Sequence, residues 1–156
     1  MAHPLIGIHA FLGELGLASF LWVFIEILDP NHSRIKRAKI ASLVGAIFLF
    51  LSWFVGGYYY VEYYGDNVKP IIKEGPQPWA HGIFTEAKEH IFLFLPFLAF
   101  TTFILIRNYS HKIEKNKKIK KSILWLCAVI LILGALMALM GYLISSGARS
   151  ALEAGI

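Results

Sequence analysis

The stretch ILWLCAVILILGALMALMGYLI, residues 123–144, decides the fold. It contains 22 residues and no charged side chain. As an α-helix it would extend about 33 Å, enough to cross the roughly 30 Å hydrocarbon core of a bilayer. A helix that is apolar on every side has to be surrounded by lipid or by a large protein core. In a chain of 156 residues, this stretch therefore predicts a transmembrane helix.

Three more apolar segments accompany it. Residues 5–28 and 40–61 are long enough by the same criterion. Residues 91–106 would extend only about 24 Å, so we expect that helix to begin earlier, through the polar residues 85–90. Pro96 should kink it and free the carbonyl group of Phe92.

The predicted fold is all-α: one four-helix transmembrane bundle formed by residues 1–156. Its helices are expected at about 5–28, 38–64, 80–107 and 121–146. Prolines and glycines between the second and third helices predict an irregular external loop at 65–79. Tyrosines and Trp79 in and beside this loop are typical of an aromatic belt at the membrane surface.

The charge distribution predicts the orientation of the helices. The chain has 15 lysine and arginine residues and a net charge of +5, and 11 of the 15 lie in the connections 29–39 and 107–121. Both connections should therefore be cytoplasmic, with both termini and the 62–82 loop outside. Because the basic residues flank apolar segments, they indicate topology and not nucleic-acid binding. We expect a multi-pass protein of the cell (inner) membrane, whose first segment is not cleaved as a signal peptide.

Two histidines carry the strongest functional signal. His9 lies 19 residues before Leu28 and His90 lies 17 residues before Arg107, and both helices run inward. The two side chains should therefore lie at nearly the same depth, in the outer part of the bilayer. Ionisable groups at such depth are costly and mark functional sites. Two imidazoles at one level on different helices can ligate a haem iron, so we predict a haem b held by both histidines.

Glycines at the same level support this prediction. Gly56 and Gly57 lie on the second helix, and Gly13 follows His9 by one turn. Glycine lets a flat macrocycle approach the backbone, although the same spacing is also typical of close helix packing. The haem propionates would point outward, toward the basic residues Lys69, Lys73, Lys88 or Arg149.

Segments 56–60, Gly-Gly-Tyr-Tyr-Tyr, and 78–90, which ends in Glu89-His90, resemble sequence motifs. The bundle that contains them is similar to small four-helix membrane b-type cytochromes, which carry histidine pairs on facing helices. The resemblance covers the bundle only and assigns no role to a single residue. It implies electron transfer near the outer face, to or from a quinone or an external redox protein. We expect such a protein to dock on the 62–82 loop.

Two other functions fit the same residues. Glu86 and His90 share one helical face and, together with His9, could hold zinc, copper or iron in a non-haem enzyme or metal-handling protein. An accessory subunit without a cofactor would use these side chains only for packing and hydrogen bonds. The chain lacks Cys-x-x-Cys-His, a phosphate-binding glycine loop and His-Glu-x-x-His. Covalent haem attachment and nucleotide hydrolysis are therefore not expected.

Some roles stay open at this point. Glu14 is either a neutral acid bonded between helices or a proton relay toward a quinone. His3 and His81 form a weaker pair near the outer surface, and Cys127 is expected to be buried and inert. The redox partner, the oligomeric state and membership of a larger complex are not determined by the sequence.

Overall fold

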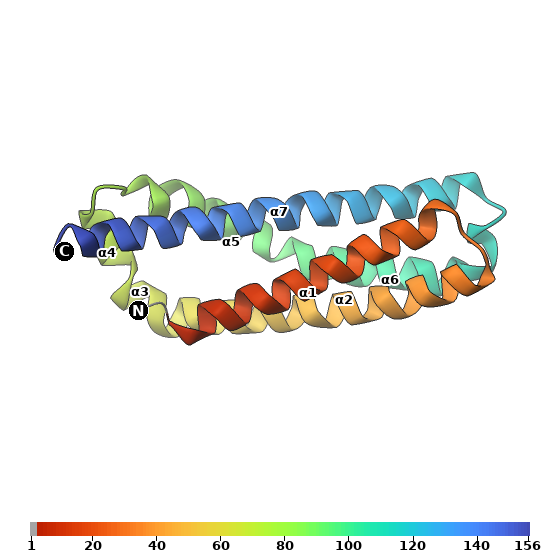
Figure 1. Cartoon of the computed structure of the whole chain (residues 1–156), viewed down its shortest axis with the longest axis horizontal. Coiled ribbons are helices and arrows are strands. Elements are labelled where there is room, and N and C mark those ends of the chain that lie inside the picture. Colours follow the sequence, from red (N-terminus) through yellow and green to blue (C-terminus); the bar gives the residue numbers. More distant parts are fainter. Residues whose placement is uncertain (1–2) are drawn as a thin grey trace.

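The computed structural model describes residues 3–156, which are almost entirely helical (Figure 1). Two of the segments, η1 and η2, are π-helical. In chain order the elements are α1 (Pro4–Leu28), α2 (His32–Tyr59), η1 (Tyr60–Tyr64), α3 (Gly65–Asn67), α4 (Lys69–Glu74), η2 (Ala80–Thr85), α5 (Glu86–Phe92), α6 (Phe94–Ile113) and α7 (Lys117–Glu153).

These elements form four long rods. Each rod is long and apolar enough to cross a membrane, and the four are Pro4–Leu28, His32–Asn67, Ala80–Ile113 and Lys117–Glu153. The predicted four-helix transmembrane bundle is confirmed. The third rod is interrupted at Leu93, one turn before Pro96, because proline has no amide hydrogen and clashes with the preceding turn.

The rods are arranged as a square. α1 packs against α2 and α7, and α6 packs against the same two helices. α1 and α6 therefore lie at opposite corners of the bundle. Both termini lie at one end of the bundle, which we call the terminal end. The α1–α2 and α6–α7 turns, with their many basic residues, lie at the opposite, basic end (Figure 1).

The prediction of an irregular loop over 65–79 is wrong for most of that range. α3 and α4 are helical, and only Val68 and the stretch 75–78 are not. Pro70 lies in the first turn of α4, where its fixed backbone angle favours a helix start. α7 also continues past residue 146, because Gly147 and Ala151 give it close contacts with Ala80 and Gly75. The loop region therefore forms a small packed cap on the end of α7.

The tightest packing lies toward the basic end. Phe20, Val23 and Ile27 of α1 are fully buried there, together with residues from all the other rods. α1 and α2 approach closely because Gly45 has no side chain. A Cβ at Gly45 would lie 2.9 Å from the ring of Phe20 and 3.0 Å from Cβ of Ser19.

We predict that Gly45→Val lowers the free energy of unfolding by about 1–3 kcal/mol, because the added methyl groups would overlap the buried Phe20 ring. Thermal unfolding in detergent micelles measures the change. Gly7→Val is the matched control, since no heavy atom lies within 4 Å of a Cβ at that position. Equal stability of the two variants would contradict the close approach of α1 and α2.

Candidate functional site

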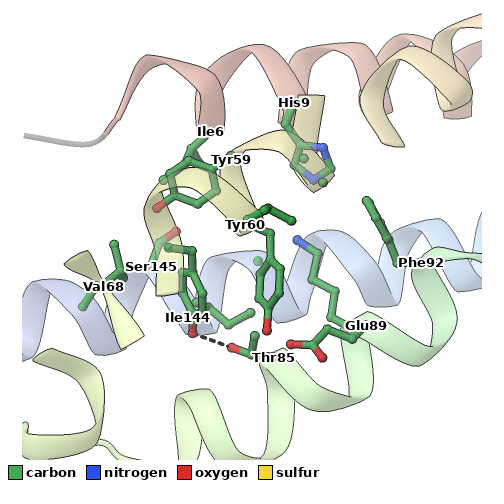
Figure 2. Close-up of a pocket in the computed structure, with 17 residues that line it drawn as sticks. Ile6, His9, Tyr59, Tyr60, Val68, Thr85, Glu89, Phe92, Ile144 and Ser145 are labelled. Atoms are coloured by element: carbon green, nitrogen blue, oxygen red, sulfur yellow. Dashed lines mark hydrogen bonds between the residues drawn. The ribbon is translucent and has the colours of Figure 1, made fainter. Parts of the chain in front are cut away.

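Two adjoining cavities occupy the terminal half of the bundle, with volumes of about 260 and 310 Å³. Their walls are mainly apolar. They share residues from α1, α5 and α7, namely Ile6, His9, Lys88, Phe92, Gly141 and Ser145. The first cavity extends toward η1 and η2 (Figure 2), and the second extends toward Gly13 and Trp53. We call the pair the terminal cavity.

His9 is held in one orientation at the wall of this cavity. Its Nδ1 atom lies 2.8 Å from the carbonyl oxygen of Ser52 and 3.0 Å from the hydroxyl oxygen of the same residue. A carbonyl oxygen can only accept, so Nδ1 carries the proton. In the neutral ring, Nε2 then has a free lone pair. The Ser52 hydroxyl donates in turn to the carbonyl oxygen of His9 at 2.8 Å.

Gly56 makes this orientation of His9 possible. A Cβ at Gly56 would lie 2.7 Å from Nδ1 and 2.8 Å from Cε1 of His9. The neighbouring Gly57 has no heavy atom within 4 Å of such a Cβ. The predicted residues Gly56 and Gly57 both line the first cavity, and Gly13 lines the second. Only Gly56 is in direct contact with the imidazole.

Lys88 brings a cationic group to the same cavity. Its Nζ atom lies 3.3 Å from where a Cβ of Gly141 would be, so the side chain reaches across to α7. Among the described residues, Nζ makes no hydrogen bond within 3.5 Å and no ion pair within 4.0 Å. Of the four basic residues expected near the outer surface, Lys88 is the one that lines the terminal cavity.

Trp53 adds a second unpaired donor. Its indole Nε1 is buried and is the one buried side-chain polar atom of residues 3–156 without a hydrogen-bond partner. The ring lines the second cavity, 6.1 Å from the ring of Phe92 between centroids. A buried donor without a partner is unusual in a native protein. Trp53 and Lys88 therefore offer two unused donors to whatever occupies the cavity.

His90 lies elsewhere. His9 faces Phe92, with ring centroids 6.3 Å apart, so His9 and His90 do lie at similar depth. However, His90 is two residues from both Lys88 and Phe92, which places it about 200° around the helix from these cavity-lining residues. The side chain is exposed, and its Nδ1 atom bonds the Glu86 carbonyl oxygen at 2.7 Å. His90 lines neither cavity, so the two imidazoles are not brought together.

The predicted metal trio of His9, Glu86 and His90 is not assembled either. Glu86 is exposed, like His90. Within the described part of the chain, no three histidine, cysteine or acidic side chains are grouped so that they could hold a metal ion. Glu14 is at the wall of the second cavity, and Glu89 is at the wall of the first.

Sequence reasoning missed a buried polar cluster beside the first cavity. The Tyr64 hydroxyl lies 3.0 Å from Nδ1 of His81. It also lies 2.9 Å from Oγ1 of Thr85, the contact marked by the dashed line in Figure 2. All three side chains are at most 5% exposed. The predicted pairing of His3 with His81 is replaced by separate contacts, since His3 packs against the rings of Tyr59 and Tyr63. A regular helical count could not find the cluster, because both elements that form it contain π-turns.

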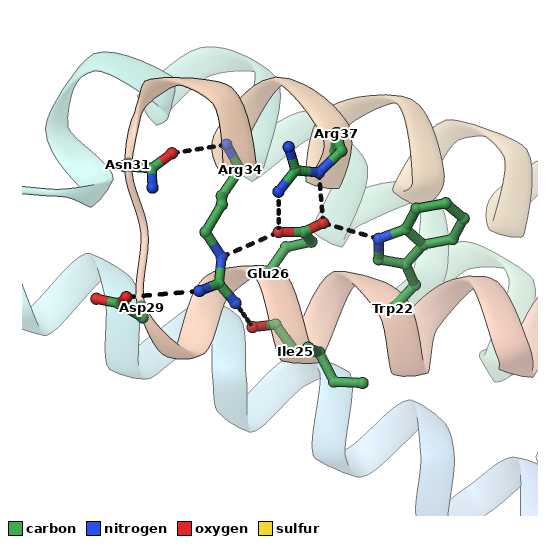
Figure 3. A network of polar contacts seen from close by, with 7 residues as sticks. All are labelled: Trp22, Ile25, Glu26, Asp29, Asn31, Arg34 and Arg37. Atoms are coloured by element: carbon green, nitrogen blue, oxygen red, sulfur yellow. Dashed lines mark hydrogen bonds and ion pairs between the residues drawn. The ribbon is translucent and has the colours of Figure 1, made fainter.

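A further charged cluster closes the basic end of the bundle (Figure 3). Glu26 is 6% exposed and accepts hydrogen bonds from Arg34, Arg37 and Trp22 at 2.6 to 3.0 Å. Three donors satisfy this carboxylate, so it needs no contact with water. We assign it a structural role, because Glu26 belongs to α1 and Arg34 and Arg37 belong to α2, so that these bonds join the two helices.

Comparison of the chain with protein-family models, curated proteins and solved structures finds no match. Assignment of a function therefore depends on the terminal cavity. Its chemistry is defined by one oriented imidazole with a free Nε2 lone pair, one ammonium group and one indole donor. These groups can hold a ligand that carries oxygen acceptors together with either a metal ion or an acidic proton.

We predict that Gly56→Ala displaces the His9 ring and that Gly57→Ala does not. Nitrogen-15 chemical shifts of histidine distinguish the two ring tautomers. The unmodified protein and Gly57→Ala should show the Nδ1-protonated form of His9, and Gly56→Ala a mixture, because its methyl group breaks the bond to Ser52. Identical spectra for both alanine variants would rule out the contact.

We predict that Glu26→Gln lowers the free energy of unfolding by about 1.5–3 kcal/mol, the usual range for hydrogen bonds to a charged group. Asp29→Asn, at a carboxylate that is 89% exposed, should change it by less than about 0.5 kcal/mol. Thermal unfolding in micelles measures both. A stable Glu26→Gln variant would show that the cluster does not join the helices.

Proposed function

We propose that this protein is a membrane electron carrier whose terminal cavity would hold one haem b, with Nε2 of His9 as the group that would ligate its iron. The observation that carries the proposal is the hydrogen bond from Nδ1 of His9 to Ser52. Histidines that ligate a metal usually donate their second ring nitrogen to a carbonyl or carboxylate, which orients the ring and raises its basicity. His9 has this arrangement, and its ring lines a mainly apolar cavity.

The other groups of the cavity fit a haem. Small residues on α2 and α7 leave room for a flat ring, and Phe92 could pack against it. Lys88 lies one helical turn nearer the terminal end than Phe92, so its ammonium group could pair with a propionate. Bound haem would supply one-electron exchange between ferric and ferrous iron. The protein would hold it, orient it and shield it from water.

The proposal depends on one histidine and not on a pair. His90 faces away from the cavity, so it is not proposed as a ligand. The exposed position of His90, among apolar side chains such as Leu93 and Phe94, favours contact with lipid or with another subunit.

The electron partners are proposed from the position of the cavity. If the positive-inside orientation holds, the terminal end faces outward from the cell (inner) membrane. The aromatic and apolar residues near the 62–82 loop include several exposed side chains, which an external redox protein could cover. They are Tyr58, Val61, Tyr63, Trp79 and Ile83.

Quinone binding in the same cavity is a second candidate, favoured by the unpaired indole of Trp53. The indole and Lys88 could donate to quinone oxygens, and His9 could accept a proton from the reduced form. A protein of this kind would show no haem spectrum but would bind one quinone molecule per chain.

We predict that protein produced with a haem supply shows a Soret band, that His9→Ala loses it, and that His90→Ala retains it. The two variants remove the same side chain at the same depth, so a difference between them reports on the cavity. Optical spectra of the oxidised and reduced purified proteins are the measurement. A missing Soret band in the unmodified protein, or its loss in both variants, would contradict ligation by His9 alone.

A further inference from the structure

The buried cluster of Tyr64, Thr85 and His81 connects the terminal cavity to the terminal end of the bundle. Tyr64 and Thr85 line the first cavity, and His81 does not. His81 lies behind them in η2, under the cap formed by α4. The three side chains thus form a continuous line of hydrogen bonds from the cavity wall to His81, which is 5% exposed and whose Nε2 atom is not fully buried.

The hydrogen bonds define the positions of the protons. Thr85 donates its hydroxyl proton to the carbonyl oxygen of Ala80 at 3.3 Å, a bond across five residues that the π-turn permits. The Oγ1 atom of Thr85 therefore accepts from Tyr64. The Tyr64 oxygen is then free to accept from Nδ1 of His81, which leaves Nε2 of His81 as a proton acceptor.

From this arrangement we propose that Tyr64 and His81 form a proton pathway that compensates charge changes in the terminal cavity. The proposal rests on the proposed function, because it requires a redox-active ligand there. An electron added to an apolar cavity creates a charge that is poorly solvated. A proton that reaches the cavity wall from the surface reduces this cost.

The transfer balances one proton. A proton from water binds Nε2 of His81, and the Nδ1 proton passes to the Tyr64 oxygen. Tyr64 passes its own proton to Oγ1 of Thr85, whose proton leaves the Ala80 carbonyl and moves to an acceptor in the cavity. Glu89 lines the same cavity and lies beside Thr85 (Figure 2), so its carboxylate is the protein acceptor.

The charged surroundings of His81 come from two elements. Lys69 and Lys73 belong to α4, and Glu86 and Glu89 to α5. η1 contributes the hydroxyl of Tyr64, and α7 packs against η2, with Gly147 close to Ala80. Two cations and two anions surround the imidazole, so protonation of His81 is not blocked by a charge excess of one sign.

The test compares three variants in lipid nanodiscs. Tyr64→Phe removes the hydroxyl and keeps the ring. His81→Asn keeps a donor near the position of Nδ1 but cannot carry a proton between water and Tyr64. Tyr109→Phe is the control, because Tyr109 is 40% exposed and lies on α6, outside the cluster and both cavities.

The rate at which a chemical reductant reduces the haem is measured by stopped-flow absorbance between about pH 5 and pH 8, where histidine titrates. The unmodified protein and Tyr109→Phe should show a rate that falls as the pH rises, because proton delivery through the pathway accompanies reduction. Tyr64→Phe and His81→Asn should be slower, lose most of this pH dependence and retain the Soret band. A pH dependence that is absent from the unmodified protein, or unchanged in both variants, would overturn the proton pathway and leave haem binding intact.

Nitrogen-15 spectra of the histidines separate this failure from failure of the proposed function, because they need no haem. The proton pathway requires that His81 is Nδ1-protonated when neutral, that it titrates, and that Tyr64→Phe changes its tautomer ratio. If His81 does not titrate, or if Tyr64→Phe leaves the tautomer ratio unchanged, the pathway is excluded whether or not haem binds. A missing Soret band with the expected spectra would instead reject the haem and leave the hydrogen-bonded line in place.

Discussion

Polar groups are costly in an apolar environment, and the whole structure reflects this constraint. An unpaired polar group in hydrocarbon costs several kcal/mol, so a chain that crosses a membrane satisfies its backbone within helices. The same cost applies to side chains. Glu26 meets it with three donors from the protein, and Tyr64 meets it with Thr85 and His81. At the terminal cavity, Lys88 and the indole of Trp53 have no hydrogen-bond partner among the described residues, so this cost is not fully offset there.

The two halves of the bundle differ for this reason. Toward the basic end, buried aliphatic and aromatic side chains fill the space between the helices. Toward the terminal end, the third rod is broken at Leu93 and both η1 and η2 contain π-turns. Irregular helices of this kind leave space and redirect side chains, and they are frequent at functional sites. The packed half holds the rods in register, and the irregular half holds the cavity.

The polar groups that line the terminal cavity have unused hydrogen-bonding capacity, and this indicates which ligands the cavity could bind. The lone pair of His9 Nε2, the ammonium group of Lys88 and the indole of Trp53 lie on three different rods and converge on one space. A packing defect alone would be lined by apolar groups. A ligand with a metal centre or proton donor and with oxygen acceptors would use all three groups at once.

How much of the fold and of the site could be predicted depends on two properties of a residue in a membrane helix. One is its depth in the membrane, and the other is its direction around the helix axis. Apolar length and the positions of the lysines and arginines determined the four helices, and counting along them placed His9 and His90 at one level. Direction depends on helical phase, which each π-turn and each break shifts by a large angle. The sequence carried no signal of η1 or η2, and counting along the helices gave the depth of His90 without its direction, so His90 was expected at the site and Tyr64 and His81 stayed unconnected. Tertiary packing alone decided which side chains face the cavity, because phase is set by contacts between rods and not by the hydrophobicity of any one of them.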